Sequence, residues 1–458
     1  KTSTQQRNNM SVTDTIVQAT VFDIPSATKL VDLKPEGDGI LFPEVISFNY
    51  YEAVLEDFIT ADLTILDSAG LVDEAFNKCG VRQFCPVHVE FSDPSKGTDW
   101  EKDRTEFAFT GDNCFYVNRV VNQVIKGKKK QYTLELINKD AIVALSKNVK
   151  SSWPPDSSTK VDYNTIVSDL LGNYVQTAKN KEPVMEEMTE SIPKLQGHNF
   201  KVYELLNSMC QYATPKGTDG SGVEETRPAG YVFYETYDEY RFDSIHKLMT
   251  EPYKLVSAYR VMPVNDNATG PEQASQTILS YKFYDGATQS SLLEEIAAKK
   301  RGKPKTQVLD VQRDTFPLIE KLPPKTVEDK CLKAASDGDF TTVKYLEQTQ
   351  YSIEYYNTCK ADALDNEPIN PELTSMNYGA MLDMLKTKTS TIRVPGNLSL
   401  SAGDHLAIDF PLIKGDSGGA SEASDKYSGA YLITKINHRV ENITHLYTHM
   451  EICKLVES

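Results

Sequence analysis

Long apolar runs and positive charge are both scarce in this chain of 458 residues. No apolar run reaches a length of about 18 residues, which a membrane-spanning helix needs, so the sequence predicts no such helix. Lys and Arg number 49 against 65 Asp and Glu, which gives a formal net charge of −16. Proteins that grip nucleic acid neutralise phosphates with clustered positive charge. The acidic balance therefore argues against such a grip, and it is compatible with a surface that DNA passes without sticking.

Cysteine is sparse and irregularly spaced. The seven cysteines include no CxxC pair, and their number is odd. This pattern favours reduced, mostly buried thiols. Cys79 and Cys85 are close in sequence, but a zinc site would need further ligands at finger-like spacing. We therefore expect no metal and no cofactor.

Tryptophan occurs only twice, whereas tyrosine occurs 24 times. Tyrosine-rich strands suit half-buried sheets and subunit interfaces. In residues 11–147 the pattern is mostly that of strands, with Ala61, Leu63 and Ile65 alternating with polar neighbours. Residues 120–125 and 131–137 are predicted to form a hairpin around a basic loop. A sheet with one buried and one solvent-exposed face is typical of a β-barrel or β-sandwich.

The pattern changes after residue 147. The segment 151–156, with two prolines, reads as a linker, and helices are predicted at 166–171 and 200–210. Further along the chain, helices are predicted at 290–300, 328–335 and 372–386. Residues 1–10 look like a flexible leader. The resulting division is a leader at 1–10, a first β domain at 11–147, a linker and helical α/β segment at 148–229, a second β domain made of 230–263 with 390–458, and a mixed α/β insertion at 264–389.

The most informative stretch is the aromatic hairpin at 230–249. Its strands alternate large groups on both faces around the polar turn 237–239, and Asp243 or Ser244 can cap the helix that follows. The stretch contains no nucleophile–base pair, so it is predicted to be structural. The aromatic residues assigned to this structural hairpin are Tyr231, Phe233, Tyr234, Tyr240 and Phe242.

The order of these elements resembles the central hub protein of contractile-tailed bacteriophage baseplates. The resemblance is carried by a helix at 201–210, a Gly- and Pro-containing loop at 214–222, and the aromatic hairpin with its following helix. The tail strands, with Ser-Gly-x-Tyr-Leu-Ile at 428–433 and Met-Glu-Ile-x-Lys at 450–454, are similar to the end of the same family. With the early strands, these places cover about half of the chain.

The resemblance implies an α+β, mainly β fold with two similar antiparallel β-barrel tube domains, a mixed α/β insertion and ring formation. It implies a structural virion protein, not an enzyme: a homotrimeric hub that joins the six-fold tail tube to the three-fold cell-puncturing spike. Its expected partners are the spike, tail tube and baseplate wedge proteins, with DNA passing through unbound and no membrane insertion. Its expected place is the phage tail baseplate, after assembly in the host cytoplasm.

Two other functions remain open from the residues. A type VI-like secretion spike component shares the barrel architecture, and a trypsin-like serine hydrolase is suggested by Gly-Asp-Ser-Gly-Gly around Ser417. Such a hydrolase also needs a histidine base and a buried aspartate. None of the earlier histidines has the Ala-Ala-His-Cys setting of that family, and the glycines of 415–419 continue into a low-complexity run typical of a loop.

Histidines and lysines supply the remaining candidates. His445 and His449 are four residues apart on one expected strand, or about 13 Å, which is too far to chelate one ion. His438 on the neighbouring strand can meet one of them, and in a trimer the three could line an axis. The basic groups that we assign to possible assembly contacts, through docking on an acidic neighbour, are Lys126, Lys128, Lys129, Lys130, Lys299, Lys300 and Arg301.

Overall fold

The structure is a computed structural model, and its described residues cover both β-rich regions and the helical segment between them. They are residues 17–22, 29–32, 44–67, 81–92, 106–127, 129–154, 161–175, 181, 183–186, 195–213, 230–250, 255–260, 277–282, 303–310, 318–320, 349–356, 378, 382, 385–386, 389–410, 427–441 and 445–455. None of the helices in these ranges combines the length and the apolar composition that crossing a membrane requires.

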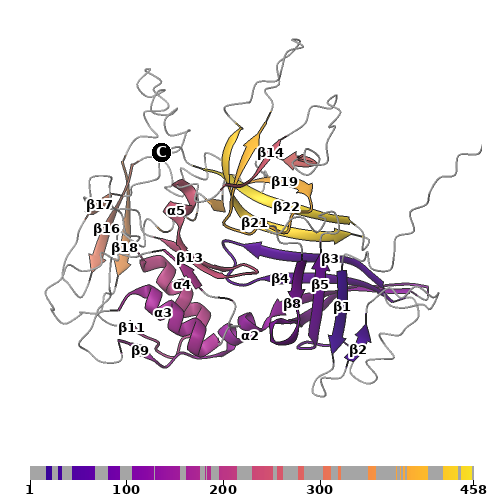
Figure 1. Ribbon diagram of the computed structural model, residues 1–458. Coiled ribbons are helices and arrows are strands. Elements are labelled where there is room, and N and C mark those ends of the chain that lie inside the picture. The colour runs from indigo at the N-terminus through magenta and orange to yellow at the C-terminus, as the bar shows by residue number, and fades with distance from the viewer. Residues whose placement is uncertain are drawn as a thin grey trace, which may run out of the picture.

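Most described strands belong to one 14-stranded sheet that runs through both β-rich regions (Figure 1). From the first region it takes β1 (Val17–Phe22), β2 (Lys29–Asp32), β3 (Glu44–Ala53), β4 (Thr60–Asp67), β5 (Pro86–Ser92), β6 (Glu106–Phe109), β7 (Phe115–Lys126) and β8 (Lys129–Asn138). From later in the chain it takes β14 (Leu255–Arg260), β15 (Ser280–Lys282), β19 (Thr389–Pro395), β20 (His405–Asp409), β21 (Gly429–Glu441) and β22 (His445–Lys454).

The first region has its own core under the sheet. In β8, Tyr132, Leu134 and Leu136 are buried while the residues between them stay half-exposed, as the alternation predicts. Aromatic rings fill much of this core, and the rings of Phe91 and Phe107 stack with centroids 4.9 Å apart. The hairpin predicted around the basic loop is formed by β7 and β8. The short 3-10 helix η1 (Gly111–Asn113) precedes it.

The second region has a separate core, and β21 joins the two. β21 pairs with β20 through its first residues, with β22 along most of its length, and with β3 through Lys435 to Glu441. The buried apolar side chains of β19, β20, β21 and β22 contribute to this second core. Because one strand borders both regions, the two cores lie under one continuous sheet.

The helical segment packs beside the sheet (Figure 1). It contains α2 (Lys139–Ser146), α3 (Tyr163–Asp169) continued by the π-helical turn η2 (Leu170–Val175), α4 (Val202–Tyr212), and the small strand pair β9 (Ser152–Trp153) and β11 (Leu195–Gln196). The side chains of Asn138 and Asp162 cap the first two helices by accepting from backbone N–H groups three residues on. The helices predicted at 166–171 and 200–210 are both present, and α3 begins earlier than expected.

The aromatic hairpin forms β12 (Tyr231–Glu235) and β13 (Tyr240–Ser244), followed by α5 (Ile245–Thr250). We expected it within the second β domain. In the structure β13 instead pairs in parallel with β10 (Pro183–Met185), so that the hairpin belongs to a separate three-stranded sheet. The physical reason is that all five residues of β12 are buried. The strand therefore has no solvent-exposed face, which a strand in the wall of a barrel or sandwich would have.

The hairpin is a partition between two cores. Tyr231, Phe233, Tyr240 and Phe242 pack with the helices, whereas Val232 and Tyr234 pack into the core of the second region. Among the described residues, the two faces of this hairpin therefore contact both the helical segment and the second β region, and Tyr378 also packs against both cores. The aromatic hairpin, which is the most informative stretch of the sequence, thus connects the helical segment with the second β region.

The chain segment between β15 and β19 forms a further three-stranded sheet. It contains β16 (Lys303–Asp310), β17 (Leu318–Glu320) and β18 (Thr349–Tyr356). Of the helix expected at 372–386, positions 378, 382, 385 and 386 are helical. The helices expected at 290–300 and 328–335 lie outside the described residues.

The mainly β class is confirmed, with a few helices and a large antiparallel sheet in which β14 and β20 pair in parallel. The two separate barrels expected from the resemblance are not resolved as such. The described strands of both regions form one branched sheet with no closed barrel among them, because the pairing of β21 with β3 continues the sheet from one region into the other.

Candidate functional site

The outward face of the joint sheet carries rows of polar side chains that cross both regions. One row runs Arg393, His449, Asn437, Tyr51 and Thr60, from β19 through β22, β21 and β3 to β4, and each residue is paired in register with the next. A second row, one two-residue step along the strands, contains Tyr447, Arg439, Asn49, Asp62, Glu135 and Arg119. We call the residues of these two rows the polar face.

Each cation of the polar face lies near a carboxylate. Arg119 contacts Glu135, and Arg439 Nε lies 2.8 Å from Glu441 Oε1. Arg393 reaches the same carboxylate at 3.9 Å and also stacks its guanidinium over the Tyr447 ring, 3.8 Å from the centroid. Exposed pairs of this kind add about 0–1 kcal/mol of stability each, so their main effect is to balance charge on the face.

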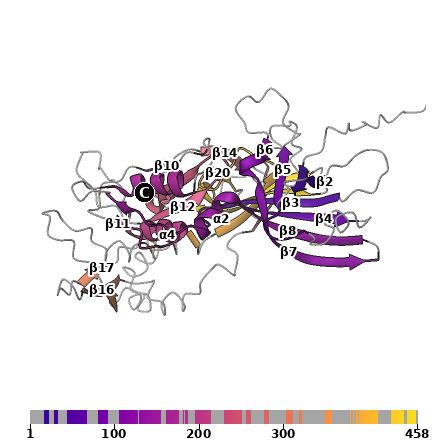
Figure 2. The ribbon, with the colours of Figure 1, turned by 90° about the horizontal axis from the view of Figure 1, so that it is seen from below.

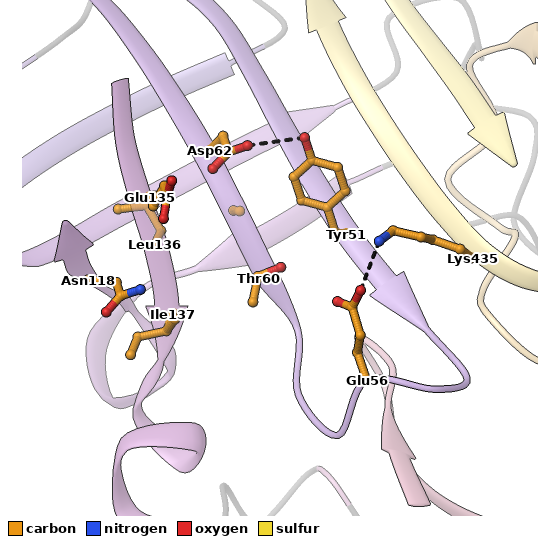
Figure 3. A pocket seen from close by; sticks show the side chains of 10 residues that line it. Tyr51, Glu56, Thr60, Asp62, Asn118, Glu135, Leu136, Ile137 and Lys435 are labelled. Carbon is orange, nitrogen blue, oxygen red and sulfur yellow. Dashed lines mark hydrogen bonds and ion pairs between the residues drawn. The ribbon is translucent and has the colours of Figure 1, made fainter. Parts of the chain in front are cut away.

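A pocket of about 320 Å³ lies on this face, over β3, β4 and β8 (Figure 3). Tyr51 donates to Asp62 across 3.1 Å, and Lys435 Nζ lies 2.8 Å from Glu56 Oε1. Burial raises the pKa of the Asp62 carboxyl, and burial together with the nearby carboxylate raises the pKa of the Tyr51 hydroxyl. Both shifts favour the protonated, uncharged form of the group.

Several buried polar atoms of the same face have no hydrogen-bond partner among the residues that the structure describes. They include Asn49 Oδ1, Asn437 Oδ1 and His449 Nε2. Burial, with Arg393 and Arg439 nearby, lowers the pKa of His449, so the ring is held in its neutral form. Unpaired polar atoms cost free energy unless water or a partner satisfies them. A face of this kind is suited to contact with water or with another polar surface.

The junction under the face is held by a buried carboxylate of β3. Glu52 accepts from Tyr50 Oη at 2.8 Å, from the Tyr237 backbone N–H at 2.9 Å and from the Ala402 N–H at 2.9 Å. These donors come from the first region, the turn of the aromatic hairpin and the second region. One side chain thus connects three parts of the fold through charge-assisted hydrogen bonds.

A second buried carboxylate joins the first region, the helical segment and the hairpin. Glu235 of β12 contacts Lys181 Nζ at 2.5 Å, and it accepts from the Ile59 N–H at 3.0 Å and from the Asn138 side chain at 2.6 Å. Tyr240 Oη donates to Asp140 at 2.6 Å, and burial raises the pKa of both groups. A buried ion pair persists only when hydrogen bonds satisfy its remaining atoms, as they do here.

The predicted hairpin residues meet in space, and all five are buried. The rings of Tyr231 and Phe242 stack with centroids 4.8 Å apart, and those of Phe233 and Tyr240 with centroids 5.7 Å apart. Tyr234 turns to the other side, where its hydroxyl lies 3.3 Å from Asp243 Oδ2. The arrangement is that of a packed interior.

The three C-terminal histidines do not come together. His438 faces the core, where Nδ1 lies 3.1 Å from Thr448 Oγ1 and Nε2 lies 3.2 Å from the Leu400 carbonyl. His445 and His449 are on the opposite face of the sheet, because His438 pairs in register with Thr448, one residue out of step. The proposed meeting of His438 with either of them is therefore wrong. Within the described ranges, no three His, Cys, Asp or Glu side chains are placed to hold a metal ion.

The basic candidates are only partly described. Lys126 and Lys129 pair at the end of the β7–β8 hairpin, Lys129 is exposed, and Lys130 Nζ lies 5.9 Å from the centre of the Tyr132 ring. Lys128, Lys299, Lys300 and Arg301 lie outside the described residues, as does Ser417 with its glycine-rich surroundings. The described cysteines are buried and form no disulfide with one another: Cys85, Cys114, Cys210 and Cys453.

Sequence reasoning missed the two buried carboxylates. Glu52 and Glu235 lie in strands whose alternation is otherwise apolar or aromatic, and a charged residue at such a position is the one available signal. Apart from Tyr50 and Tyr240, their partners come from 54 to 350 residues away, and no local pattern predicts which ones. Lys181 is an example, since it is one of two lysines in the segment 179–181 and nothing there singles it out.

No protein-family model matches the chain, and no curated protein matches it in sequence. In three dimensions it is similar to a tail protein of Neisseria meningitidis MC58, at 9% identity and a TM-score of 0.48, over 96% of this chain and 96% of that one. It is also similar to the 43 kDa tail protein of prophage MuSo2 from Shewanella oneidensis, at 8% identity and a TM-score of 0.48, over 97% and 100%. A third similar structure is an E. coli protein described as a component of the type VI secretion system, at 9% identity and a TM-score of 0.40, over 91% and 74%.

Proposed function

We propose that the chain is a structural subunit of a bacteriophage tail, the central hub of a contractile-tail baseplate. Three copies form a ring that connects the six-fold tail tube to the three-fold spike and leaves a passage for DNA. The spike, tube and baseplate wedge proteins are its partners. In this proposal the protein is not an enzyme, and its role in the tail is structural.

The observation that carries this proposal is the pairing of β21 with β3. It joins two β regions, each with its own core, into one wall within a single chain. A ring of three such chains presents six β units, which matches a six-fold tube on one side while keeping three-fold symmetry for the spike. In that ring the two regions act as the two barrel-like tube domains, completed by contacts between copies.

The charge balance of the polar face supports its use as the lining of the passage. Duplex DNA carries about one negative charge per 1.7 Å of axis, so a lining of free cations would hold it. The cations Arg119, Arg393 and Arg439 are each near a carboxylate, as is Lys435 of the neighbouring pocket. Such a lining keeps the duplex hydrated and lets it slide.

The aromatic hairpin supports the structural part of the proposal. A hub must transmit force between tube and spike without coming apart, and the hairpin packs into two cores at once while its turn binds Glu52 of the first region. Residues this deeply packed resist displacement, because interiors are close to crystal density.

Mass measurement in solution tests the proposal. Light scattering coupled to gel filtration is expected to give three times the chain mass of 51.3 kDa. A monomer at micromolar concentration would contradict the hub assignment. The full chain is used, since the two β regions share a sheet and are not expected to fold apart.

A further inference from the structure

The chain on either side of the β9–β11 pair forms an exposed surface of the helical segment. The antiparallel pairing of β9 with β11 continues toward α2 and α4, where the Val149 N–H donates to the Phe200 carbonyl at 2.8 Å. Figure 2 shows α2, α4 and β11 at the other end of the molecule from the free end of the β7–β8 hairpin. The exposed and half-exposed residues of this pairing are 145–148, 150 and 198–201, and we call them the lysine surface.

A β-bulge in this pairing brings an aromatic side chain to the surface. Asn199 and Phe200 both lie opposite Val149, whose carbonyl accepts from the Asn199 N–H at 3.0 Å while its N–H bonds to Phe200. Asn199 has a φ of +64°, the left-handed conformation found at the first residue of one class of bulge. Because the extra residue interrupts the alternation of the strand, His198, Asn199 and Phe200 are exposed one after another.

The backbone holds the bulge in place. The Phe200 N–H donates to the Gly197 carbonyl at 2.8 Å. Gly197 packs so closely on Val149 that an added Cβ would lie 2.6 Å from the Val149 Cγ1 atom. Phe200 is 49% exposed on this ordered backbone. An aromatic ring presented in this way loses little conformational freedom when a partner covers it.

The lysines of the same surface are not balanced by carboxylates. Residues 145–150 and 198–201 contain three lysines and no Asp or Glu. Lys147 and Lys201 donate to uncharged backbone carbonyls of η2 and α2, and among the described residues none of the three lysines has a carboxylate partner. Glu204, in the first turn of α4, accepts from the Lys201 backbone N–H instead. The cations of the polar face differ, since each of them lies near a carboxylate.

We infer that the lysine surface binds an acidic segment of a partner protein, and that Phe200 is the apolar anchor of this contact. The chain carries a net charge of −16, so most of its surface repels an acidic partner and this part attracts it. Leu145, which is 48% exposed, adds apolar area beside the lysines. The inference goes beyond the proposed function and does not require the ring, because every group that it uses lies within one chain.

The apolar groups favour a protein partner over nucleic acid. A phosphate backbone offers no apolar group against which Leu145 can be withdrawn from water, whereas an acidic peptide with leucines does. Three lysines also release few counterions from DNA, while the net charge of the chain repels it. Single-stranded DNA, whose bases can stack on an aromatic ring such as Phe200, is therefore the competing ligand that the experiment includes.

Fluorescence anisotropy with a labelled synthetic peptide that alternates Glu with Leu tests the contact. The wild-type chain is expected to bind this peptide, and the binding should weaken as salt is added. The same peptide with Gln in place of Glu should bind at least about tenfold more weakly. Absence of binding, equal binding of the Gln peptide, or tighter binding of a single-stranded DNA oligonucleotide would each overturn the inference.

Two variants locate the site on the chain. Lys150→Glu and Phe200→Ser are each expected to weaken binding of the Glu peptide about tenfold or more. Lys150 is chosen because Lys147 and Lys201 also hold helix ends.

The matched controls are Lys435→Glu, which makes the same charge change in a lysine already paired with Glu56, and Val184→Ser, which removes another exposed apolar group. Both should bind the peptide as the wild-type chain does. Unfolding midpoints establish that all four variants are folded. Wild-type affinity in a folded Lys150→Glu or Phe200→Ser variant would contradict the assigned surface.

Discussion

Gly403 lies against the hydroxyl group of Tyr234, so closely that a Cβ atom on Gly403 would fall 2.1 Å from the Tyr234 oxygen. Gly403 has a φ of +87° and donates its N–H to the Ile433 carbonyl at 2.9 Å. The loop between β19 and β20 is thereby pressed onto the aromatic hairpin. This contact ties the second β region to the partition that separates it from the helices.

Replacing Gly403 with Ala should destabilise the fold through both strain and steric overlap. A non-glycine residue in the left-handed region costs about 1–2 kcal/mol, and overpacking adds about 1–3 kcal/mol. Gly127→Ala is the matched control, since Gly127 has a φ of +64° with no atom within 4 Å of its added Cβ. Denaturant unfolding should show the larger loss for Gly403→Ala. Equal losses would mean that the contact with Tyr234 relaxes freely.

Truncating the hairpin side chains should cost as much as other deep core changes. Tyr234→Ala and Phe242→Ala are each expected to lower the free energy of unfolding by about 3–5 kcal/mol, because both side chains are buried. Tyr234→Phe keeps the ring and removes only the bond to Asp243, so its loss should be smaller. A loss of less than about 1 kcal/mol for the Ala variants would indicate an accessible binding surface instead.

The buried and exposed ion pairs should respond differently to removal of the cation. Lys181→Met leaves Glu235 buried without its counter-charge, and such changes cost about 3–5 kcal/mol. Lys435→Met removes the partner of Glu56 in a pair whose side chains are 36% and 46% exposed, and should cost at most about 1 kcal/mol. Thermal or denaturant unfolding of the two variants measures the difference. Similar losses would contradict the structural role of the Glu235 cluster.

The hairpin shows how far sequence reasoning reaches in this fold. Its strands, its turn and α5 were predictable because turn chemistry and aromatic alternation are local. Its placement was not, since Tyr231 and Tyr234 face different cores and nothing local distinguishes those cores. The pairing of β21 with β3 joins residues nearly 400 positions apart, and it decides that the two β regions share a wall. A separation of 350 residues likewise hid the hydrogen bond that the Ala402 N–H donates to Glu52.

The positions of the three C-terminal histidines also depend on a long-range feature that local sequence does not reveal. His438, His445 and His449 look like a cluster by spacing, but whether they share a face depends on the register between β21 and β22. A bulge between Ile433 and Lys435 shifts that register. The pairing of His438 with Thr448 then points its ring into the core. Register set by an irregularity of this kind is not readable from alternation alone.

His405 should make stability depend on pH. It is buried, with Nε2 2.9 Å from the Leu248 carbonyl, and burial lowers its pKa in the folded state. Arg241 lowers it further, whereas the backbone bond and Asp243 raise it. As pH falls below the unfolded value of about 6.5, the unfolded chain gains a proton that the folded chain does not. Stability is therefore lost from there down to the lower folded pKa, where the loss levels off.

The variant His405→Gln keeps a side-chain donor and removes this titration. Unfolding midpoints at pH 7.5 and pH 5.5 should fall more for the wild-type chain than for the variant, since the other titrating groups are common to both. An identical pH dependence would show that His405 is not held neutral by burial.

The central claim is that three copies enclose a passage lined by the polar face. Electron cryo-microscopy of the assembled protein measures this directly. We predict a three-fold ring whose passage is bordered by the rows through Tyr51, Asn437 and His449, with the basic segments 126–130 and 299–305 on the outer wall or at contacts with neighbours. A passage lined by either basic segment, or an assembly with no passage, would contradict the account.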